Sequence, residues 1–311
     1  MVVTTPIIIK QEIAIKSCQH EALAIFAYFD VFHYPLTIQE VSRYSKSPIS
    51  EIDLFDLVEK GALKKIASDY YCLVDSQADL NKRIEGNKKA QSLEKKAIRK
   101  ANFIGRFPFV RSVCISGSMS KGYMDEDADL DFFIITKAER LWIARTFLIL
   151  YKKVFLFNSR KFFCINYLID TEHLEIEEQN QFTATEVVTL INVFGQTDFD
   201  AFVAANQWAY KYYPNMTPNK LTGKIGRGAF KKFNEWILNG WLGAKLDGFY
   251  MKVTLKRWER KFGSTLDEKD FEVAFKTRKY VSKHHPGNFQ RMVLDQSAKN
   301  LKQVELKLEL A

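Results

Sequence analysis

The stretch that decides the fold is residues 109–136, FVRSVCISGSMSKGYMDEDADLDFFIIT. It begins with an apolar, β-branched run that ends at Ser-Gly-Ser (116–118), and it closes with a second apolar run over 132–136. Apolar runs of this length, bounded by Gly, Ser and Asp, predict β-strands. Ten residues, 119–128, separate the Ser-Gly-Ser sequence from an Asp-Leu-Asp sequence at 129–131. The sequence therefore predicts two strands joined by a polar, acidic loop.

Two carboxylates open the second of these strands. Alternate residues of a strand point to the same face, so Asp129 and Asp131 are expected side by side. Adjacent carboxylates repel each other unless a cation lies between them, and oxygen ligands of this kind suit Mg²⁺ or Mn²⁺. The pair is therefore the candidate metal site, and both residues are catalytic candidates.

The Gly-Ser sequence at the end of the first strand is a candidate phosphate site. The missing side chain of Gly117 lets a phosphate approach the backbone, where N–H groups and the Ser118 hydroxyl can hold it. Lys121 and Gly122 follow in the same loop. The Lys121 ammonium can reach a β- or γ-phosphate, and a solvated surface lysine is the alternative. With the two carboxylates, the loop predicts a site for a metal-bound triphosphate.

This arrangement resembles the DNA polymerase β-like nucleotidyltransferase superfamily, whose hallmark is a strand, Gly-Ser, a short stretch with a further glycine, and Asp-x-Asp. The likeness is close over 109–136 and looser to about residue 170. It implies Mg²⁺-dependent transfer of a nucleoside monophosphate from an NTP to an acceptor hydroxyl, with release of pyrophosphate. The acceptor is left open among a small molecule, a protein and RNA, and no oligomeric state is predicted.

The family usually adds a third carboxylate near the start of the next strand, predicted here within 161–170 (KFFCINYLID). The expected position falls on Cys164 or Asn166, and neither is a carboxylate. Asn166 can still offer a carbonyl oxygen to a metal. Asp170 is a weaker catalytic candidate, because the register places it at the far end of the strand. The departure opens a second hypothesis, a nucleotide-binding or regulatory protein that keeps the fold but has lost the chemistry.

Residues 1–80 have the outline of a winged helix, with three helices and a two-stranded hairpin. Apolar residues at helical spacing over 19–31 predict the first helix, and capping boxes at 37–40 and 50–53 open two more. The third helix, SEIDLFDLVEK, carries four acidic residues and one lysine, so it would repel DNA phosphates. We therefore expect an interaction or packing module; winged-helix binding of nucleic acid is the alternative.

The net charge of +9 is distributed unevenly. Residues 1–80 carry −4 and residues 111–200 carry −5, whereas residues 81–110 carry +7 and residues 201–311 carry +11. Residues 81–102 predict a basic helix, for which a solvated linker is preferred over a phosphate-contacting face. The basicity that suggests a phosphate-rich partner thus belongs to two segments.

The C-terminal third mixes aromatic and basic residues. We expect a helical cap whose aromatic side chains pack inward; base stacking and docking on an anionic membrane are the alternatives. Lys279, Lys283, His284 and His285 are candidates for the phosphate end of the cleft. The aromatic residues concerned are Phe230, Phe233, Trp236, Trp241, Phe249 and Trp258.

The whole composition fits a chain with real hydrophobic cores, since 47% of its 311 residues are hydrophobic. It shows neither a membrane-spanning run nor signal-peptide features, and its four cysteines form no CxxC pair, so we expect a cytoplasmic protein. The predicted class is α+β. It comprises a winged-helix-like module (1–80), a linker helix with a nucleotidyltransferase core on a small mixed sheet (81–200), and a basic α-helical domain (201–311).

Overall fold

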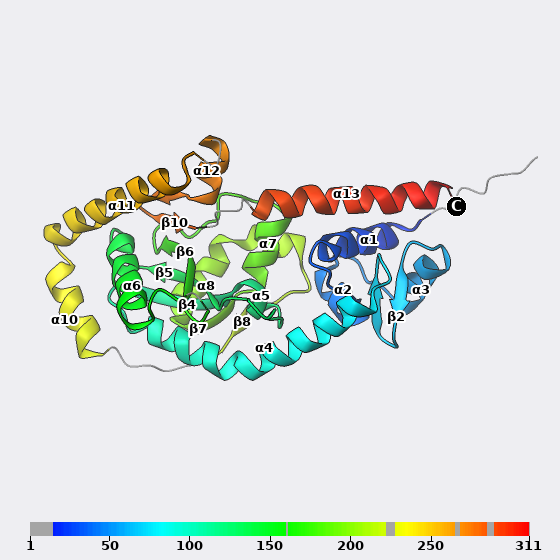
Figure 1. The fold of residues 1–311 in the computed structure, drawn as a ribbon, viewed down its shortest axis with the longest axis horizontal. Helices are drawn as coiled ribbons and strands as arrows, with labels where there is room; N and C mark the ends of the chain where they lie inside the picture. Colours follow the sequence, from blue (N-terminus) through cyan, green and yellow to red (C-terminus); the bar gives the residue numbers. More distant parts are fainter. Residues whose placement is uncertain (1–14, 160, 222–227, 265–267, 285–288, 311) are drawn as a thin grey trace, which may run out of the picture. The chain divides into compact units, whose positions relative to one another are not determined.

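The computed structural model shows a mixed α/β protein (Figure 1). The chain divides into two compact units, one formed by residues 1–80 with 293–311 and the other by residues 81–292. Residues 201–311, predicted as a separate domain, therefore form no unit of their own and contribute to both. The structure describes residues 15–159, 161–221, 228–264, 268–284 and 289–310.

The first unit contains the three helices and the hairpin predicted for it. Thr37 and Ser50 cap the second and third helices as predicted, each accepting the backbone N–H three residues further on. A short additional strand pairs with the hairpin in the order β1-β3-β2. The elements are α1 (Ser17–Asp30), β1 (Leu36–Thr37), α2 (Ile38–Tyr44), α3 (Glu51–Glu59), β2 (Lys64–Ile66) and β3 (Tyr70–Cys72).

The acidic side chains of α3 are used inside this unit. Asp53 Oδ1 pairs with Lys16 Nζ at 3.0 Å, and Asp56 Oδ2 accepts a hydrogen bond from Gln19 Nε2 at 2.6 Å. Hydrogen bonds from Ser50 and Lys16 lower the pKa of Asp53 to about 2. The negative third helix is thus held against the start of α1 by its own carboxylates.

The last helix, α13 (Phe289–Leu310), brings the end of the chain to α1. Asn300 Nδ2 donates a hydrogen bond to Asp30 Oδ2 at 2.9 Å, and His20 Nε2 lies 2.7 Å from Glu305 Oε1. Residues 293–310 therefore complete the unit that residues 15–80 begin.

The second unit is built on a seven-stranded sheet in the order β8-β7-β4-β5-β6-β10-β9. β4 is antiparallel to β5, whereas β5 and β6 are parallel and are joined through the helix α6. β9 and β10 come from the C-terminal third, which ties that third to the sheet. The strands are β4 (Val110–Ser116), β5 (Asp131–Thr136), β6 (Cys164–Asp170), β7 (Ile191–Phe194), β8 (Asn219–Lys220), β9 (Thr277–Arg278) and β10 (Val281–Lys283).

Helices cover both faces of this sheet. Phe132 and Ile134 of β5 lie in a core cluster with residues of α4 and α6. The Phe133 ring faces the other way and lies 5.0 Å from the Phe202 ring of α8. Asp131, two residues before Phe133, shares its face. The helices are α4 (Gln77–Ile104), α5 (Gly117–Ser120), α6 (Leu141–Phe155), α7 (Gln181–Val188), α8 (Gln196–Ala205), α9 (Gln207–Tyr212), α10 (Ala229–Leu238), α11 (Trp241–Phe262) and α12 (Glu268–Ala274).

The sequence also predicts a capping box at residues 183–186, with helices that continue from it to Tyr212, and the structure contradicts this run of helices. The run Ile191–Phe194 forms β7 between β8 and β4, because a short segment with β-branched residues gains backbone hydrogen bonds beside β4. The predicted capping box at Thr183 is also displaced. Asn180 is the N-cap of α7, and its side chain accepts the Thr183 N–H at 3.1 Å.

The prediction that the C-terminal aromatic residues pack inward is wrong for five of the six. Trp258 is buried, but the other five side chains are exposed. On α10 the reason is that Lys231 and Glu235 occupy the inner side of the helix, where they bind backbone groups around the start of β4.

Asp247 on α11 caps the start of α6. Its Oδ1 accepts the Ile143 N–H at 2.9 Å, and the residue is buried. Burial raises the pKa of Asp247 to about 7, although hydrogen bonds from the backbone of Ile143 and Trp142 act in the opposite direction. α11 therefore supplies a cap that the sequence of α6 itself lacks.

The raised pKa of Asp247 predicts a pH dependence of stability. Between about pH 4 and pH 7 the folded state keeps a proton that the unfolded chain has lost, so this contribution falls as pH rises and is constant above pH 7. The fall amounts to at most about 4 kcal/mol. Urea unfolding of wild type and Asp247→Asn across this range tests it. Parallel stability curves for the two proteins would contradict the assignment.

Candidate active site

Asp131, the first residue of β5, lies at the centre of the site. It is paired with Ser116 on β4 and with Cys164 on β6. The preceding residue, Leu130, donates its N–H to Lys161 O at 3.1 Å and accepts the Cys164 N–H at 3.0 Å. These bonds hold the backbone of Leu130 against the segment that leads into β6. Asp131 then opens β5, whereas Asp129 precedes the strand.

Gly117 brings the end of β4 directly against this carboxylate. Its φ is +66°, in the left-handed region, and a Cβ built on it would lie 2.5 Å from Asp131 Oδ2. Only glycine satisfies both the backbone angle and the close approach. The sequence-predicted phosphate site and metal site are therefore in contact with each other.

Replacing Gly117 by alanine is expected to destabilise the fold more than replacing Gly122. Gly122 has φ +72°, but nothing lies within 4 Å of a Cβ built there. Gly122→Ala should therefore lower the free energy of unfolding by about 1 kcal/mol, through the strained left-handed backbone alone. Gly117→Ala should lower it by about 1–3 kcal/mol, because Asp131 must also move. Urea unfolding of both variants measures the difference, and equal losses would show that the contact with Asp131 carries no energy.

The Asp131 carboxyl lies where a negative charge is unfavourable. Burial raises its pKa to about 7, and the charges of Asp129 and Glu186 act in the same direction. Asn166 Nδ2 donates a hydrogen bond to Asp131 Oδ1, and Cys164 Sγ donates to Asn166 Oδ1 at 3.0 Å. The two β6 side chains at the expected third-carboxylate position thus orient Asp131 through hydrogen bonds.

Glu186 on α7 is a site residue that the sequence analysis missed. Its Oε1 pairs with Lys121 Nζ at 2.8 Å, and Lys121 Nζ also donates to Gly117 O at 3.1 Å. The sequence pattern places Glu186 in a capping box with Thr183. Asn180, three residues before Thr183, is the sequence signal for an earlier N-cap. A helix that begins after Asn180 needs no capping role for Glu186, whose side chain can then contact the site.

Ser118 and Gly122 complete the predicted phosphate loop. Ser118 Oγ has Met124 Sδ as a partner at 3.7 Å, which is a weak acceptor, so the hydroxyl can turn to a stronger one. Gly122 O accepts a hydrogen bond from Asn87 Nδ2 of α4 at 2.6 Å. Gly122 therefore shapes the loop and ties it to α4.

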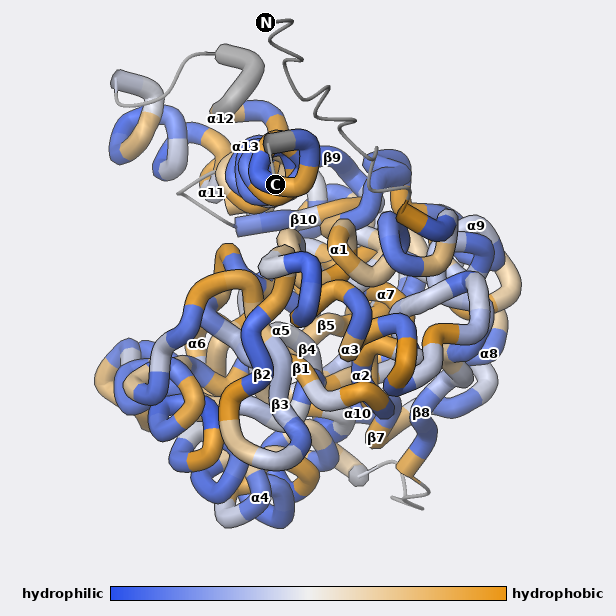
Figure 2. The backbone as a smooth tube through the Cα atoms, turned by 90° about the vertical axis from the view of Figure 1, so that its right-hand side faces the viewer, coloured by the Kyte–Doolittle hydropathy of each residue, from blue (hydrophilic) through white to orange (hydrophobic). Residues whose placement is uncertain are grey.

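The basic helix α4 holds the acidic loop that follows. Lys82 Nζ pairs with Asp125 Oδ2 at 2.9 Å, and Lys89 Nζ donates to the carbonyl oxygens of Asp125 and Glu126 at 2.8 and 3.0 Å. Figure 2 shows that hydrophilic residues predominate along α4. Part of the basic charge predicted for a solvated linker thus serves the loop that leads to Asp129.

The structure places Asp170 away from this site. Asp170 pairs with Thr136 at the opposite ends of β6 and β5, about 17 Å along β5 from Asp131. Its Oδ1 accepts the backbone N–H groups of Glu172 and His173, both at 3.0 Å. Asp170 is therefore a buried turn residue and is not brought together with the other candidates.

A pocket opens beside Asp131, between the sheet and α7. It holds about 860 Å³ of space, part of it open to solvent, and apolar and aromatic side chains predominate in its walls. Its charged groups include Asp131, Glu186, Glu178 and Lys283. Burial lowers the pKa of Lys283, whose Nζ lies 3.4 Å from Gln290 Oε1. A concave, mostly apolar wall with a few charged groups is typical of small-molecule sites.

The other predicted cleft residues are distributed differently. His284 packs its ring on Trp258 and Phe275, with centroids 5.2 and 5.3 Å away, and Lys279 does not line this pocket. His285 lies outside the described residues. Of that group, Lys283 is the member that the structure brings to the pocket.

The carboxylate pair fits a cation that shares its ligands with a substrate. Among the residues that the structure describes, no group of three or more His, Cys, Asp or Glu side chains is arranged to hold a metal ion. Mg²⁺ is commonly held by one or two carboxylates together with substrate phosphates, and two carboxylates that repel each other favour such an ion. Comparison with family models, with curated proteins and with solved structures finds no match to this chain.

Proposed function

We propose that this chain is a nucleotidyltransferase that moves a nucleoside monophosphate from an NTP to an acceptor hydroxyl. The contact between Gly117 and Asp131 is the observation that carries the proposal. It brings the Gly-Ser backbone directly against the Asp131 carboxylate, at the rim of a pocket. The spacing of the Gly-Ser and Asp-x-Asp sequences, which resembles that of the polymerase β-like superfamily, supports the same reaction.

Asp129 and Asp131 are the residues that would hold Mg²⁺ or Mn²⁺. When bound, such an ion neutralises triphosphate charge and stabilises the attacking and leaving oxygens. The side chains and backbone of the protein position the carboxylates and the phosphate loop. Asn166 keeps Asp131 oriented, and the missing side chain at Gly117 leaves room for the Asp131 carboxylate beside the loop.

The remaining loop residues bind the triphosphate in this proposal. Backbone N–H groups after Gly117 and the Ser118 hydroxyl donate to phosphate oxygens, and Lys121 offers a positive charge that it now shares with Glu186. The acceptor oxygen bonds to the α-phosphorus, the bond from that phosphorus to the bridging oxygen breaks, pyrophosphate leaves, and the acceptor proton passes to solvent. The shape and apolar walls of the pocket favour a small-molecule acceptor over a protein or an RNA end.

A second candidate function is nucleotide binding without transfer. The observation that favours it is the start of β6, where Cys164 and Asn166 stand at the position of the family's third carboxylate. Both side chains are engaged in hydrogen bonds that lead to Asp131. A regulatory protein would need the phosphate loop and the carboxylate pair but no group to activate an acceptor.

Nucleotide turnover separates the two candidates. Purified chain is incubated with each NTP labelled at the α-phosphate, with Mg²⁺ or Mn²⁺ and a pool of small hydroxyl-bearing metabolites. Pyrophosphate release together with transfer of the label supports the transferase. Saturable, metal-dependent NTP binding without transfer supports the second candidate, and the absence of both overturns the proposed site.

A further inference from the structure

The helix α10 turns its polar side inward. Lys231 is 2% exposed, and its Nζ donates to Gly105 O at 2.9 Å. Glu235 Oε1 accepts the Phe109 N–H at 2.7 Å. In a water-soluble amphipathic helix the apolar side normally faces the core. Here the two charged residues are the inner anchors, and the apolar side faces outward.

The outward side of α10 is strongly apolar. Its exposed residues follow one another at intervals of three and four, so they share one side of the helix. Trp236 alone is 79% exposed. The first two residues of α11 extend the surface. We define the outer apolar face as Phe230, Phe233, Trp236, Ile237, Trp241 and Leu242.

The outer apolar face continues along α11, which packs against α6 (Figure 1). Phe249 and Val253 are exposed and lie on the same side of α11 as Leu242. The opposite side of α11 holds the buried Asp247 and Trp258. The exposed apolar residues of α11 are therefore not core residues left uncovered by chance, because this helix has a separate buried side.

Basic side chains flank this surface. All residues of α10 and α11 are described, and seven basic side chains on them are exposed, against the single exposed acid Glu259. Lys252 and Lys256 lie beside Phe249 on α11, and Lys245 Nζ lies 4.6 Å from the centre of the Trp241 ring. The surface thus combines aromatic, aliphatic and cationic groups on one side of the unit.

We infer that the outer apolar face docks on the surface of an anionic lipid bilayer. Exposed Trp, Phe and Leu side chains insert at the level of the headgroups, and flanking lysines and arginines bind anionic lipid. No helix among the described residues is long and apolar enough to cross a membrane, so the docking is interfacial. The inward anchors Lys231 and Glu235 keep the apolar side of α10 presented.

Two other occupants fit less well. Two copies joined by a two-fold axis would bring the same patch of each copy together, so the lysines of α11 would face lysines. A single-stranded nucleic acid would gain from stacking on the aromatic rings, but Ile237, Leu242 and Val253 offer no ring to a base. Aliphatic side chains beside cations match acyl chains beneath phosphate headgroups.

Vesicle binding tests the inference on the full chain. Vesicles of phosphatidylcholine alone are compared with vesicles of phosphatidylcholine and phosphatidylglycerol in equal parts. Binding to the anionic vesicles, with a blue shift of tryptophan emission, is expected for wild type. Phe233→Ser with Trp236→Ser, and separately Lys252→Glu with Lys256→Glu, should each lower the partition by about tenfold or more.

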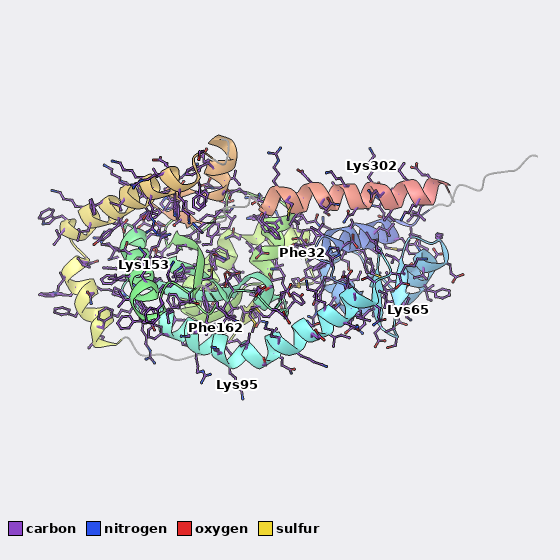
Figure 3. All side chains as sticks on the ribbon, in the orientation of Figure 1. Phe32, Lys65, Lys95, Lys153, Phe162 and Lys302 are labelled. Atoms are coloured by element: carbon purple, nitrogen blue, oxygen red, sulfur yellow. The ribbon has the colours of Figure 1, made fainter. Side chains whose placement is uncertain are left out.

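Matched variants elsewhere control for nonspecific loss. Ile52→Ser with Phe55→Ser removes two exposed apolar side chains of α3, and Lys88→Glu with Lys95→Glu reverses two exposed charges of α4. Figure 3 labels Lys95, which projects from α4. Both controls should bind vesicles like wild type.

Four results would overturn the inference. They are no binding to anionic vesicles, equal loss in the control variants, a wild-type dimer that the Phe233/Trp236 variant dissociates, and displacement from vesicles by single-stranded oligonucleotide at the same face. The test variants should unfold at the same temperature as wild type, because the replaced side chains are exposed and are not part of the hydrophobic core.

Discussion

Replacing Asp131 by asparagine is expected to abolish nucleotide turnover and to leave the metal-free fold at least as stable as wild type at pH 8. The change removes the charge that would hold the cation, so turnover should fall by about 10³-fold or more. Because burial raises the pKa of Asp131 to about 7, the wild-type protein bears the cost of a desolvated charge at pH 8. Pyrophosphate release and urea unfolding measure the two effects.

Asp170→Asn is the matched control at the other end of the same strands. Asp170 accepts two backbone hydrogen bonds in a turn and is buried. Its replacement should cost about 1–3 kcal/mol of stability and leave turnover close to wild type. If both variants lose turnover equally, or if Asp170→Asn alone loses it, Asp131 is not the residue that holds the metal. Metal-dependent NTP affinity gives the same comparison without relying on transfer.

The second large effect is expected for Gly195→Ala. Gly195 joins β7 to α8 with φ +74°, and a Cβ built on it would lie 1.8 Å from the carbonyl oxygen of Arg111 in β4. That oxygen belongs to a strand in the middle of the sheet, so it cannot move aside without breaking strand pairing. We expect a loss of about 3–5 kcal/mol in the free energy of unfolding.

Gly122→Ala provides the comparison, because it has nearly the same φ and an open surrounding. The difference between the two variants in urea unfolding measures the steric part of the Gly195 effect. A loss at Gly195 no larger than that at Gly122 would mean that β4 and β7 separate easily. The pairing of β7 with β4 would then contribute little to the sheet.

The centre of the candidate site could be predicted from sequence because its determinants are local. Two apolar strands, a glycine between them and an Asp-x-Asp at the second strand lie within residues 109–136, and the structure forms β4, α5 and β5 there. Strand register predicted that Asp170 lies at the far end of its strand. The common side of Asp129 and Asp131 stays a prediction, because β5 begins at Asp131 and strand alternation does not extend to Asp129.

The walls of the site could not be predicted in the same way. Lys283 reaches the pocket because β10 pairs with β6, a pairing between segments far apart in the chain. Glu186 reaches it because α7 begins at an asparagine cap and not at the threonine that the pattern favoured. The mixture of aromatic and basic residues likewise predicted a helical cap, but the direction predicted for the aromatic side chains of α10 was wrong. The orientation of α10 is set by hydrogen bonds of Lys231 and Glu235 to backbone groups of residues 105 and 109, which lie far away in the sequence.

The packing of the last helix against the first has a consequence for synthesis. Asn300 and Val304 of α13 are buried in the unit that residues 15–80 begin, and Asn300 bonds to Asp30. Domains usually fold from the N-terminus as the ribosome releases them. The unit that residues 15–80 begin is completed only after residues 81–292 have been made, because its final helix follows them in the chain. Its unfinished surface is therefore exposed throughout translation of the unit that holds the candidate active site.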